Sequence, residues 1–299
     1  MSGEQNPYPG LRPFKFEESY LFFGREGQSE DLLRRLKRNH FVAVVGTSGS
    51  GKSSLVRAGL LPLLSSGFMP EAGASWRIAI FRPGNSPIQN LAQALVHPEQ
   101  ADAAPPAGEN KTGAALDVGI AETFLRRSAV GLLDYADSAL GAEENLLVVV
   151  DQFEELFRFK KDSGIEKSED EAAAFVKLFL EATRDKTERV YVIITMRSDF
   201  LGDCSQFRDL PEAINDGQYL IPRLSRDQLR QVIESPAKVH GVEMSPALVT
   251  NLLNAIGDDQ DQLPVLQHSL MRTWDKWAER EIRNSKITDN DYESRNNAQ

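Results

Sequence analysis

Several residue types and patterns are scarce in this sequence, and each scarcity excludes a class of protein. The 299 residues include one cysteine, Cys204, so no disulfide can form within the chain, as is usual in a reducing compartment. The longest apolar runs have about five residues, whereas a helix across a bilayer needs about 20, and no secretory signal pattern opens the sequence. We therefore expect a cytoplasmic protein with no membrane partner.

Positive charge is also in deficit. Lys and Arg total 34 against 44 Asp and Glu, which gives a net charge of −10, whereas a chain that binds nucleic acid generally carries a basic footprint. The four histidines are scattered and do not have the spacing of metal ligands. We thus expect neither nucleic acid as a partner nor a histidine-based metal site.

One short run stands out against this background. Residues 46–53 read Gly-Thr-Ser-Gly-Ser-Gly-Lys-Ser and fit the phosphate-loop pattern G-x-x-x-x-G-K-[ST] of nucleoside triphosphatases. An apolar, β-branched run at 41–45 precedes the motif, and an amphipathic helical pattern at 53–64 follows it. Strand, loop and helix are the arrangement that such a loop requires. We therefore predict that the chain binds ATP or ADP together with Mg²⁺.

The residue types of the motif suit a phosphate site. Glycines let the backbone curl until several N–H groups point at one spot, and the helix N-terminus adds positive potential there. Lys52 can reach the β- and γ-phosphates, and the Ser53 hydroxyl can hold Mg²⁺. The predicted nucleotide-binding residues of the loop are Gly46, Ser48, Gly49, Ser50, Gly51, Lys52, Ser53 and Ser54.

The chain around the motif alternates apolar strand patterns with helical ones. Strands are predicted at 41–45, 76–82, 146–150, 189–195 and 218–222, and helices near 29–38, 53–64, 86–96, 118–139 and 169–184. This alternation predicts an α/β fold, the P-loop NTPase three-layer sandwich with a parallel sheet. Residues 97–117, rich in Ala, Pro and Gly, are predicted to form a mobile surface loop, and the charged stretch 160–171 a similar one.

The patterns divide the chain into three regions. Residues 1–38 hold the first helix and, before it, an extended segment whose prolines between 7 and 13 exclude helix and central strand. Residues 39–224 form the NTPase core. From 225 onward the patterns are helical only, because Ser225 and Gln228 make a capping box and Pro264 opens a further helix. We therefore expect a small all-helical domain at 225–299.

Acidic and basic side chains at two strand ends supply the rest of a hydrolytic site. Asp151 directly follows the strand at 146–150, so it lies at the carboxyl edge of the sheet and can serve as the metal-side carboxylate. Glu154 or Glu155, on the turn that follows, can orient the attacking water, and we favour Glu154; the alternative is a solvated pair. Arg197, at the end of the strand at 189–195, can touch the γ-phosphate; the alternative is a surface arginine paired with Asp199.

These segments together resemble a known family. The run at 6–14, Asn-Pro-Tyr-Pro-Gly-Leu-Arg-Pro-Phe, is followed by Phe-Phe-Gly-Arg-Glu at 22–26, the phosphate loop, Val-Asp-Gln-Phe-Glu-Glu-Leu at 150–156, Arg-Ser-Asp-Phe-Leu at 197–201 and Leu-Pro-Val-Leu-Gln at 263–267. The chain resembles the STAND NTPases, and more narrowly the bacterial novel STAND NTPase 1 domain, over nearly its whole length. The opening run is the most specific part because no general P-loop fold demands it.

The resemblance implies a slow, regulatory ATPase that acts as a signalling switch. ADP would hold a closed monomer, and exchange for ATP would open it, so that it associates with itself and activates a fused or separate effector. The resemblance also implies that Gly24 and Arg25 lie near the base and ribose, that Arg197 is the sensor, and that Pro264 packs over the nucleotide.

The sequence departs from the family at two places. The family usually has glycine where this chain has Asp261, which bears on how closely that loop can approach adenine. Relatives also continue past a Tyr-Glu pair into a winged-helix region, whereas this sequence stops at Gln299. We therefore expect a switch truncated before the winged helix, without its effector or sensor domain.

Two other functions share these motifs. A DNA-handling AAA+ or transposition-regulator ATPase has the same loop and strand order, and salt-sensitive DNA binding would favour it. A scaffold that binds ADP and turns over almost nothing would also keep the phosphate loop. A small-molecule kinase is the least favoured, because no acceptor-substrate motif accompanies the site.

Overall fold

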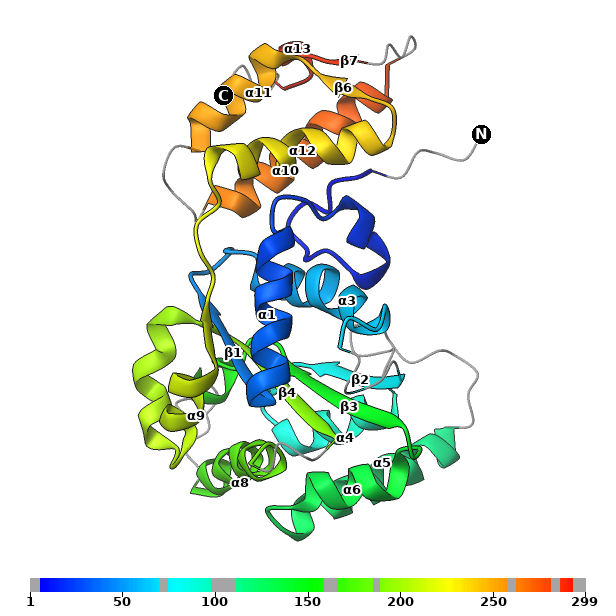
Figure 1. Ribbon diagram of the computed structural model, residues 1–299, viewed down its shortest axis with the longest axis vertical. Helices are drawn as coiled ribbons and strands as arrows, with labels where there is room; N and C mark the ends of the chain where they lie inside the picture. The colour runs from blue at the N-terminus through cyan, green and yellow to red at the C-terminus, as the bar shows by residue number, and fades with distance from the viewer. Residues whose placement is uncertain are drawn as a thin grey trace. The chain divides into compact units, whose positions relative to one another are not determined.

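The computed structural model describes residues 6–69, 72, 75–97, 111–158, 166–184, 189–256, 262–280 and 286–292 (Figure 1). The chain separates into two compact units. The sheet unit consists of Asp31–Gly46 and Leu63–Leu220, and the helical unit consists of Met1–Glu30, Thr47–Pro62 and Ile221–Gln299. The phosphate loop thus groups with the two ends of the chain.

The sheet unit is built on five parallel strands in the order β2-β3-β4-β1-β5. The strands are β1 (Phe41–Gly46), β2 (Ser75–Phe81), β3 (Glu144–Val150), β4 (Val190–Arg197) and β5 (Gln218–Leu220). Nearly every residue of β1, β3 and β4 is buried, as expected for parallel strands that are covered on both faces. All five predicted strands and their parallel arrangement are confirmed.

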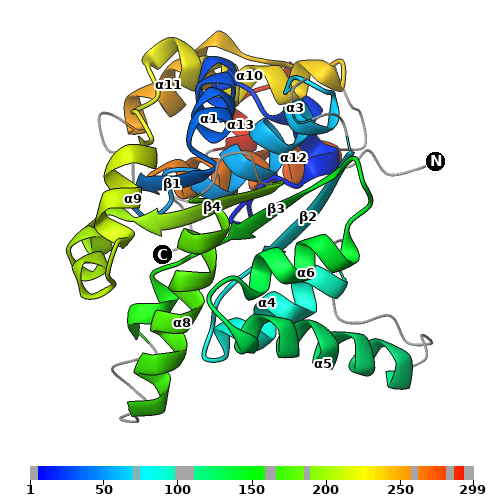
Figure 2. The same cartoon turned by 60° about the horizontal axis from the view of Figure 1, so that its bottom comes forward.

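Helices cover this sheet on both sides. Figure 2 shows α4 (Pro87–Val96), α5 (Lys111–Arg127), α6 (Gly131–Ala139) and α8 (Glu166–Ala182) below the sheet, and the core there joins Val148, Ile194 and their neighbours to Leu91 and Phe175. From Asp31 on, α1 (Glu26–Asn39) lies on the opposite side, with Leu32 and Leu36 fully buried. The α9 helix (Leu210–Gly217) packs beside β1. The predicted α/β three-layer class is confirmed.

One predicted helix and two predicted loops need correction. The single helix expected at 118–139 is two helices, because the chain turns at 128–130, where Gly131 approaches Phe124 so closely that an added Cβ would lie 2.1 Å from the Phe124 carbonyl oxygen. Part of the loop predicted at 97–117 is helical, since α5 begins at Lys111. Part of the loop predicted at 160–171 is helical as well, since α8 begins at Glu166. Residues 98–110 and 159–165 lie outside the described residues.

The helical unit contains η1 (Phe16–Leu21), α2 (Lys52–Ser54), the π-helical η2 (Leu55–Leu60), α10 (Arg226–Val239), α11 (Pro246–Ile256), α12 (Leu263–Ala278) and α13 (Asp289–Tyr292). The helical run that α2 and η2 begin continues as α3 (Leu61–Ser65), whose residues from Leu63 on belong to the sheet unit. The predicted capping box is confirmed, because the Gln228 N–H donates to Ser225 Oγ and the Gln228 side chain accepts from the Ser225 N–H.

The region after 225 is not helical throughout. Two short strands, β6 (Glu243–Met244) and β7 (Lys286–Ile287), pair in parallel, and Ile287 also accepts a backbone hydrogen bond from Ser245 at 2.8 Å. Pairing over two residues has no sequence pattern long enough to predict it. The departure at Asp261 lies outside the described residues.

The N-terminal segment follows the predicted course, without helix or strand between residues 6 and 15. Its side chains anchor it to the C-terminal helices of the same unit. The Asn6 amide donates to the Met271 carbonyl oxygen at 2.9 Å and to Asp275 Oδ1 at 2.8 Å. The Tyr8 hydroxyl donates to the Ile233 carbonyl oxygen at 2.6 Å, and burial raises the pKa of this tyrosine. The predicted domain boundary at 224 lies close to the division at 220 and stays a prediction.

Candidate nucleotide site

The phosphate loop has the backbone that its sequence requires. Gly49 and Gly51 adopt φ of +73° and +89°, in the left-handed region that glycine enters without steric cost. Between them the loop curls tightly, with the Ser50 N–H donating to the Thr47 carbonyl oxygen at 3.3 Å. The helical run then starts at Lys52. Its ammonium donates to the Thr47 carbonyl oxygen at 2.6 Å, so the lysine folds back over the loop.

The donors of this loop fit a phosphate group. Ser50 is 1% exposed, and its hydroxyl has no hydrogen-bond partner in the described part of the chain, although buried hydroxyls almost always have one. Ammonium, hydroxyl and curled backbone N–H groups are the chemistry that phosphates accept. The Ser54 hydroxyl, by contrast, already accepts the Phe14 N–H at 3.2 Å, so it holds the N-terminal segment.

Arg25 supports the phosphate loop through the protein itself. Its side chain is buried, and its guanidinium donates to the Ser50 carbonyl oxygen at 2.8 Å, to Gln28 Oε1 at 2.5 Å and to the Pro222 carbonyl oxygen at 3.4 Å. The residue therefore joins the loop, α1 and the segment that leads into α10. Its predicted contact with the nucleotide stays a prediction.

Gly24 and Pro264 each have a role in the local structure of the helical unit. Gly24 has φ of +84°, and a Cβ there would lie 2.8 Å from the Gln228 carbonyl oxygen, so only glycine allows this approach to α10. Pro264 is half-buried in the first turn of α12, where proline is favoured because its missing N–H needs no partner. Their predicted proximity to the nucleotide is untested.

The three acidic side chains lie at the carboxyl edge of the sheet and differ in their contacts. Asp151 is 2% exposed, and its Oδ1 accepts the Thr195 hydroxyl at 2.6 Å. Glu154 is buried, and its Oε2 accepts the Arg197 N–H at 3.3 Å. Glu155 is half-buried, and its Oε2 accepts the Gly84 N–H at 3.1 Å.

The strand order shows that Glu154 and Glu155 point to opposite sides of β3. Gly84 follows β2, on one side of β3, whereas Arg197 ends β4, on the other side. Arg197 also pairs in register with Gly46, the first glycine of the phosphate-loop motif. Glu154 therefore turns toward the strand that carries the motif, and Glu155 turns away from it. Sequence spacing alone could not separate the two.

Arg197 is held by its neighbours in sequence. Its guanidinium makes a two-pronged pair with Asp199, with Nε to Oδ1 at 3.0 Å and Nη2 to Oδ2 at 2.6 Å, and it lies 5.5 Å from the centre of the Phe200 ring. The guanidinium beside Asp199 holds the pKa of that carboxyl below its ordinary value. This pair is the alternative that the sequence left open, and the sensor role stays a prediction.

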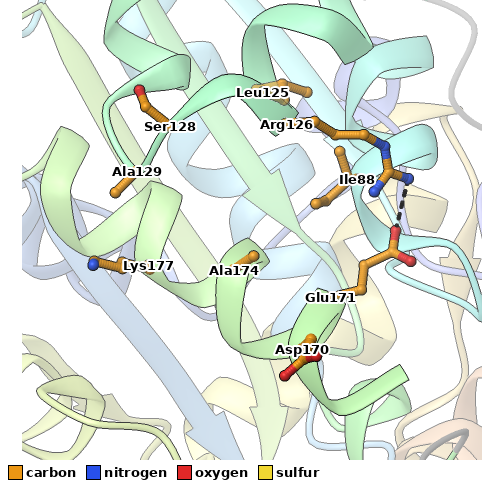
Figure 3. A pocket seen from close by; sticks show the side chains of 9 residues that line it. All are labelled: Ile88, Leu125, Arg126, Ser128, Ala129, Asp170, Glu171, Ala174 and Lys177. Carbon is orange, nitrogen blue, oxygen red and sulfur yellow. Dashed lines mark hydrogen bonds and ion pairs between the residues drawn. The ribbon is translucent and has the colours of Figure 1, made fainter. Parts of the chain in front are cut away.

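A separate cavity of about 590 Å³ opens between α4, α5 and α8. Figure 3 shows Arg126 of α5 paired with Glu171 of α8, at 3.1 Å, and the apolar side chains of Leu125 and Ala174 also line the cavity. None of the described residues that line it is a predicted site residue. The cavity therefore gives no support to a second nucleotide site.

The described residues offer neither a preformed metal cluster nor a membrane-spanning helix. They contain no cluster of three or more His, Cys, Asp or Glu side chains that could hold a metal ion, which fits Mg²⁺ only where phosphate oxygens and waters supply most of its ligands. Nor does any helix among them combine the length and the apolar character that a membrane crossing requires.

A parallel sheet in this order, a glycine-rich phosphate loop after β1 and a buried acid after β3 define the class as a P-loop nucleoside triphosphatase. Within that class the chain belongs to the family Novel STAND NTPase 1, whose model matches residues 7–298. The predicted family is thereby confirmed. No curated protein matches the chain.

Solved structures share the fold at low identity. The ORC2 protein of Aeropyrum pernix, in ADPNP–ADP complexes, has 17% identity and a TM-score of 0.54, over 92% of this chain and 64% of that one. The ORC1 protein of the same organism, in complex with DNA, has 16% identity and a TM-score of 0.52, over 89% of this chain and 63% of that one. The Walker-type ATPase PABY2304 of Pyrococcus abyssi has 15% identity and a TM-score of 0.51, over 88% of this chain and 71% of that one. The chain thus spans less than two thirds of the two ORC proteins.

Proposed function

We propose that this chain binds ATP with Mg²⁺, hydrolyses it slowly and uses the bound nucleotide to switch between conformations that differ in self-association and effector signalling. The observation that supports this most is the register of β1 with β4. It sets Gly46, where the phosphate loop begins, beside Arg197, whose N–H holds Glu154. Family membership supports the same class of activity.

In this proposal each site residue has a separate role in ATP hydrolysis. Lys52 and the loop N–H groups bind the β- and γ-phosphates, and Ser53 and Asp151 hold Mg²⁺, which neutralises phosphate charge when bound. Glu154 orients the attacking water, because its carboxylate turns toward the motif strand while that of Glu155 is held by Gly84 on the far side. The ADPNP–ADP complexes of the ORC2 protein support adenine nucleotides as ligands for this fold.

Coupling of the nucleotide to conformation rests on the helical unit. Its members include both the phosphate loop and α10 to α13, and Arg25 bonds to Ser50 of the loop and to Pro222, the latter four residues ahead of α10. A change in the loop on exchange of ADP for ATP would therefore reach the C-terminal helices through a short connection that runs through the buried Arg25 side chain. A ligand shifts such an equilibrium only through its different affinity for the two states.

The proposal is tested by light scattering, limited proteolysis and hydrolysis assays with ADP and with ATP, each with Mg²⁺. We expect a monomer with ADP, a different proteolytic pattern with ATP, and slow turnover that Lys52→Ala abolishes. A stable large oligomer with ADP, or identical proteolysis with either nucleotide, would contradict the switch. Tight nucleotide binding with no turnover would leave the scaffold function instead.

DNA handling is the second candidate, favoured by one observation: a structure of similar fold, the ORC1 protein, was solved in complex with DNA. The net charge of −10 weighs against it. Fluorescence anisotropy with a labelled duplex at 50 and 200 mM salt separates the two. Binding that falls steeply between these salt concentrations would favour DNA handling.

A further inference from the structure

Thr195, which none of the motifs includes as a site residue, makes hydrogen bonds to three consecutive residues, 151–153, of the turn that follows β3. Its hydroxyl donates to Asp151 Oδ1 at 2.6 Å and accepts the Gln152 N–H at 3.0 Å. Its carbonyl oxygen accepts the Phe153 N–H at 2.9 Å. Thr195 is 1% exposed, so water does not compete for these bonds.

The direction of the hydroxyl bond follows from chemistry. The Gln152 N–H can only donate, so the threonine oxygen accepts there, and its single proton is left for the Asp151 carboxylate. A hydrogen bond donated to a carboxylate is strong. The bond also fixes the rotation of the Asp151 side chain, since Oδ1 is held to β4.

The turn after Asp151 needs this support. Gln152 has φ of +58°, a left-handed conformation that costs free energy for a residue other than glycine. The bond from its N–H to Thr195 stabilises the sharp turn, and the turn in turn places Glu154 beside the Arg197 N–H. Asp151 and Glu154 are thus both held by the last residues of β4.

We propose that Thr195 is a positioning residue that orients Asp151 toward the metal ion of a bound Mg²⁺–nucleotide. This inference rests on the proposed function. Partners that orient metal ligands typically account for 10–100-fold in metal affinity. Loss of the hydroxyl should therefore raise the Mg²⁺ requirement and leave metal-free nucleotide binding, which depends on the phosphate loop, unchanged.

The test compares Thr195→Val, which keeps the shape and removes the hydroxyl, with Thr195→Ser, which keeps the hydroxyl. Thr183→Val is a matched control, because Thr183 is also buried in the sheet unit and its hydroxyl donates to a backbone carbonyl oxygen, that of Phe179 at 2.9 Å, instead of to a carboxylate. Binding of a fluorescent ATP analogue is measured in EDTA and across a Mg²⁺ titration, without reliance on turnover.

We expect Thr195→Val to raise the half-saturating Mg²⁺ concentration about tenfold or more, with wild-type affinity in EDTA, while the serine and Thr183 variants stay within about twofold of wild type. An unchanged Mg²⁺ requirement in Thr195→Val, or an equal rise in Thr183→Val, would overturn the inference. If the valine variant does not fold, a tenfold rise in Thr195→Ser would overturn it. Failure of the proposed function itself is distinguishable, since Lys52→Ala and Asp151→Asn would then leave nucleotide and Mg²⁺ binding intact.

Discussion

Replacing Arg25 with methionine separates two roles for this residue, support of the phosphate loop and contact with the nucleotide. Methionine has a similar length and keeps the apolar packing, but it removes every donor. The buried guanidinium makes two strong hydrogen bonds, of 2.5 and 2.8 Å, and a longer one of 3.4 Å. If the role is support, the loss must appear in the stability of the protein without any nucleotide.

The structure sets the size of this loss. Hydrogen bonds from a charged donor contribute about 1.5–3 kcal/mol each, so the two strong bonds give roughly 3–6 kcal/mol. Part of this is offset because a buried cation no longer has to be desolvated, and we expect a net loss of about 3 kcal/mol. With a urea m-value of about 2.5 kcal/mol per M, the midpoint should fall by roughly 1 M.

The assay is urea unfolding of nucleotide-free protein, followed by tryptophan fluorescence, to which Trp274 and Trp277 of the helical unit contribute. Arg35→Met is the control, because this exposed arginine also donates to one backbone carbonyl oxygen, that of Gln218 at 2.9 Å. Its loss should cost less than about 1 kcal/mol.

One result would refute the reasoning. If Arg25→Met unfolds at the wild-type urea concentration and loses only nucleotide affinity, the arginine acts on the ligand, and its bonds to Ser50 and Pro222 contribute nothing to stability. A fall in stability alone, with unchanged affinity in the folded population, would instead exclude the contact with base or ribose.

Three further predictions concern single side chains. Lys52→Ala should weaken ATP binding or transition-state stabilisation by several kcal/mol without changing the thermal midpoint of the nucleotide-free protein, as checked by calorimetry; unchanged turnover would refute the site. Glu154→Gln should slow hydrolysis and spare ATP affinity, whereas Glu155→Gln should retain most turnover in a single-turnover assay; the reverse pattern would reassign the water-orienting residue. Burial raises the pKa of the Cys204 thiol to about 12, so at pH 8 roughly one molecule in 10⁴ is thiolate, and a thiol reagent should modify the native protein far more slowly than the urea-unfolded protein; rapid modification of native protein would show that the thiol is accessible.

The strands could be predicted from the sequence because burial on both faces makes each one a continuous apolar run. β5 alone is shorter than predicted, ending at Leu220, since Pro222 has no N–H to add to a ladder. The helix break before Gly131 was not predictable, because it depends on the close approach of Phe124, which no local pattern encodes. The parallel pair β6–β7 was not predicted either, because it joins two-residue segments that lie far apart in the sequence.

The candidate site divides in the same way. The sequence correctly places the phosphate-loop motif at the end of β1 and Asp151 directly after β3, because both patterns are local, and their roles at a nucleotide stay predictions. The contacts of Arg25 with Ser50 and Pro222 join residues 25 and 197 positions apart, so no spacing reveals them. Thr195 went unnoticed because threonine is an ordinary strand residue, and only its bond to Asp151 distinguishes it.

The attachment of Asn6 to α12 has a consequence for how the protein is made. Asn6 and its partner Asp275 are 269 positions apart. At a translation rate of about 5–20 residues per second, Asn6 waits roughly 15–55 s for the residues that it will contact. Meanwhile, all the strands of the large sheet emerge from the ribosome before α12 does. The helical unit can therefore be completed only after α12 has emerged, and the N-terminal segment with its buried tyrosine is exposed to proteases and chaperones until then.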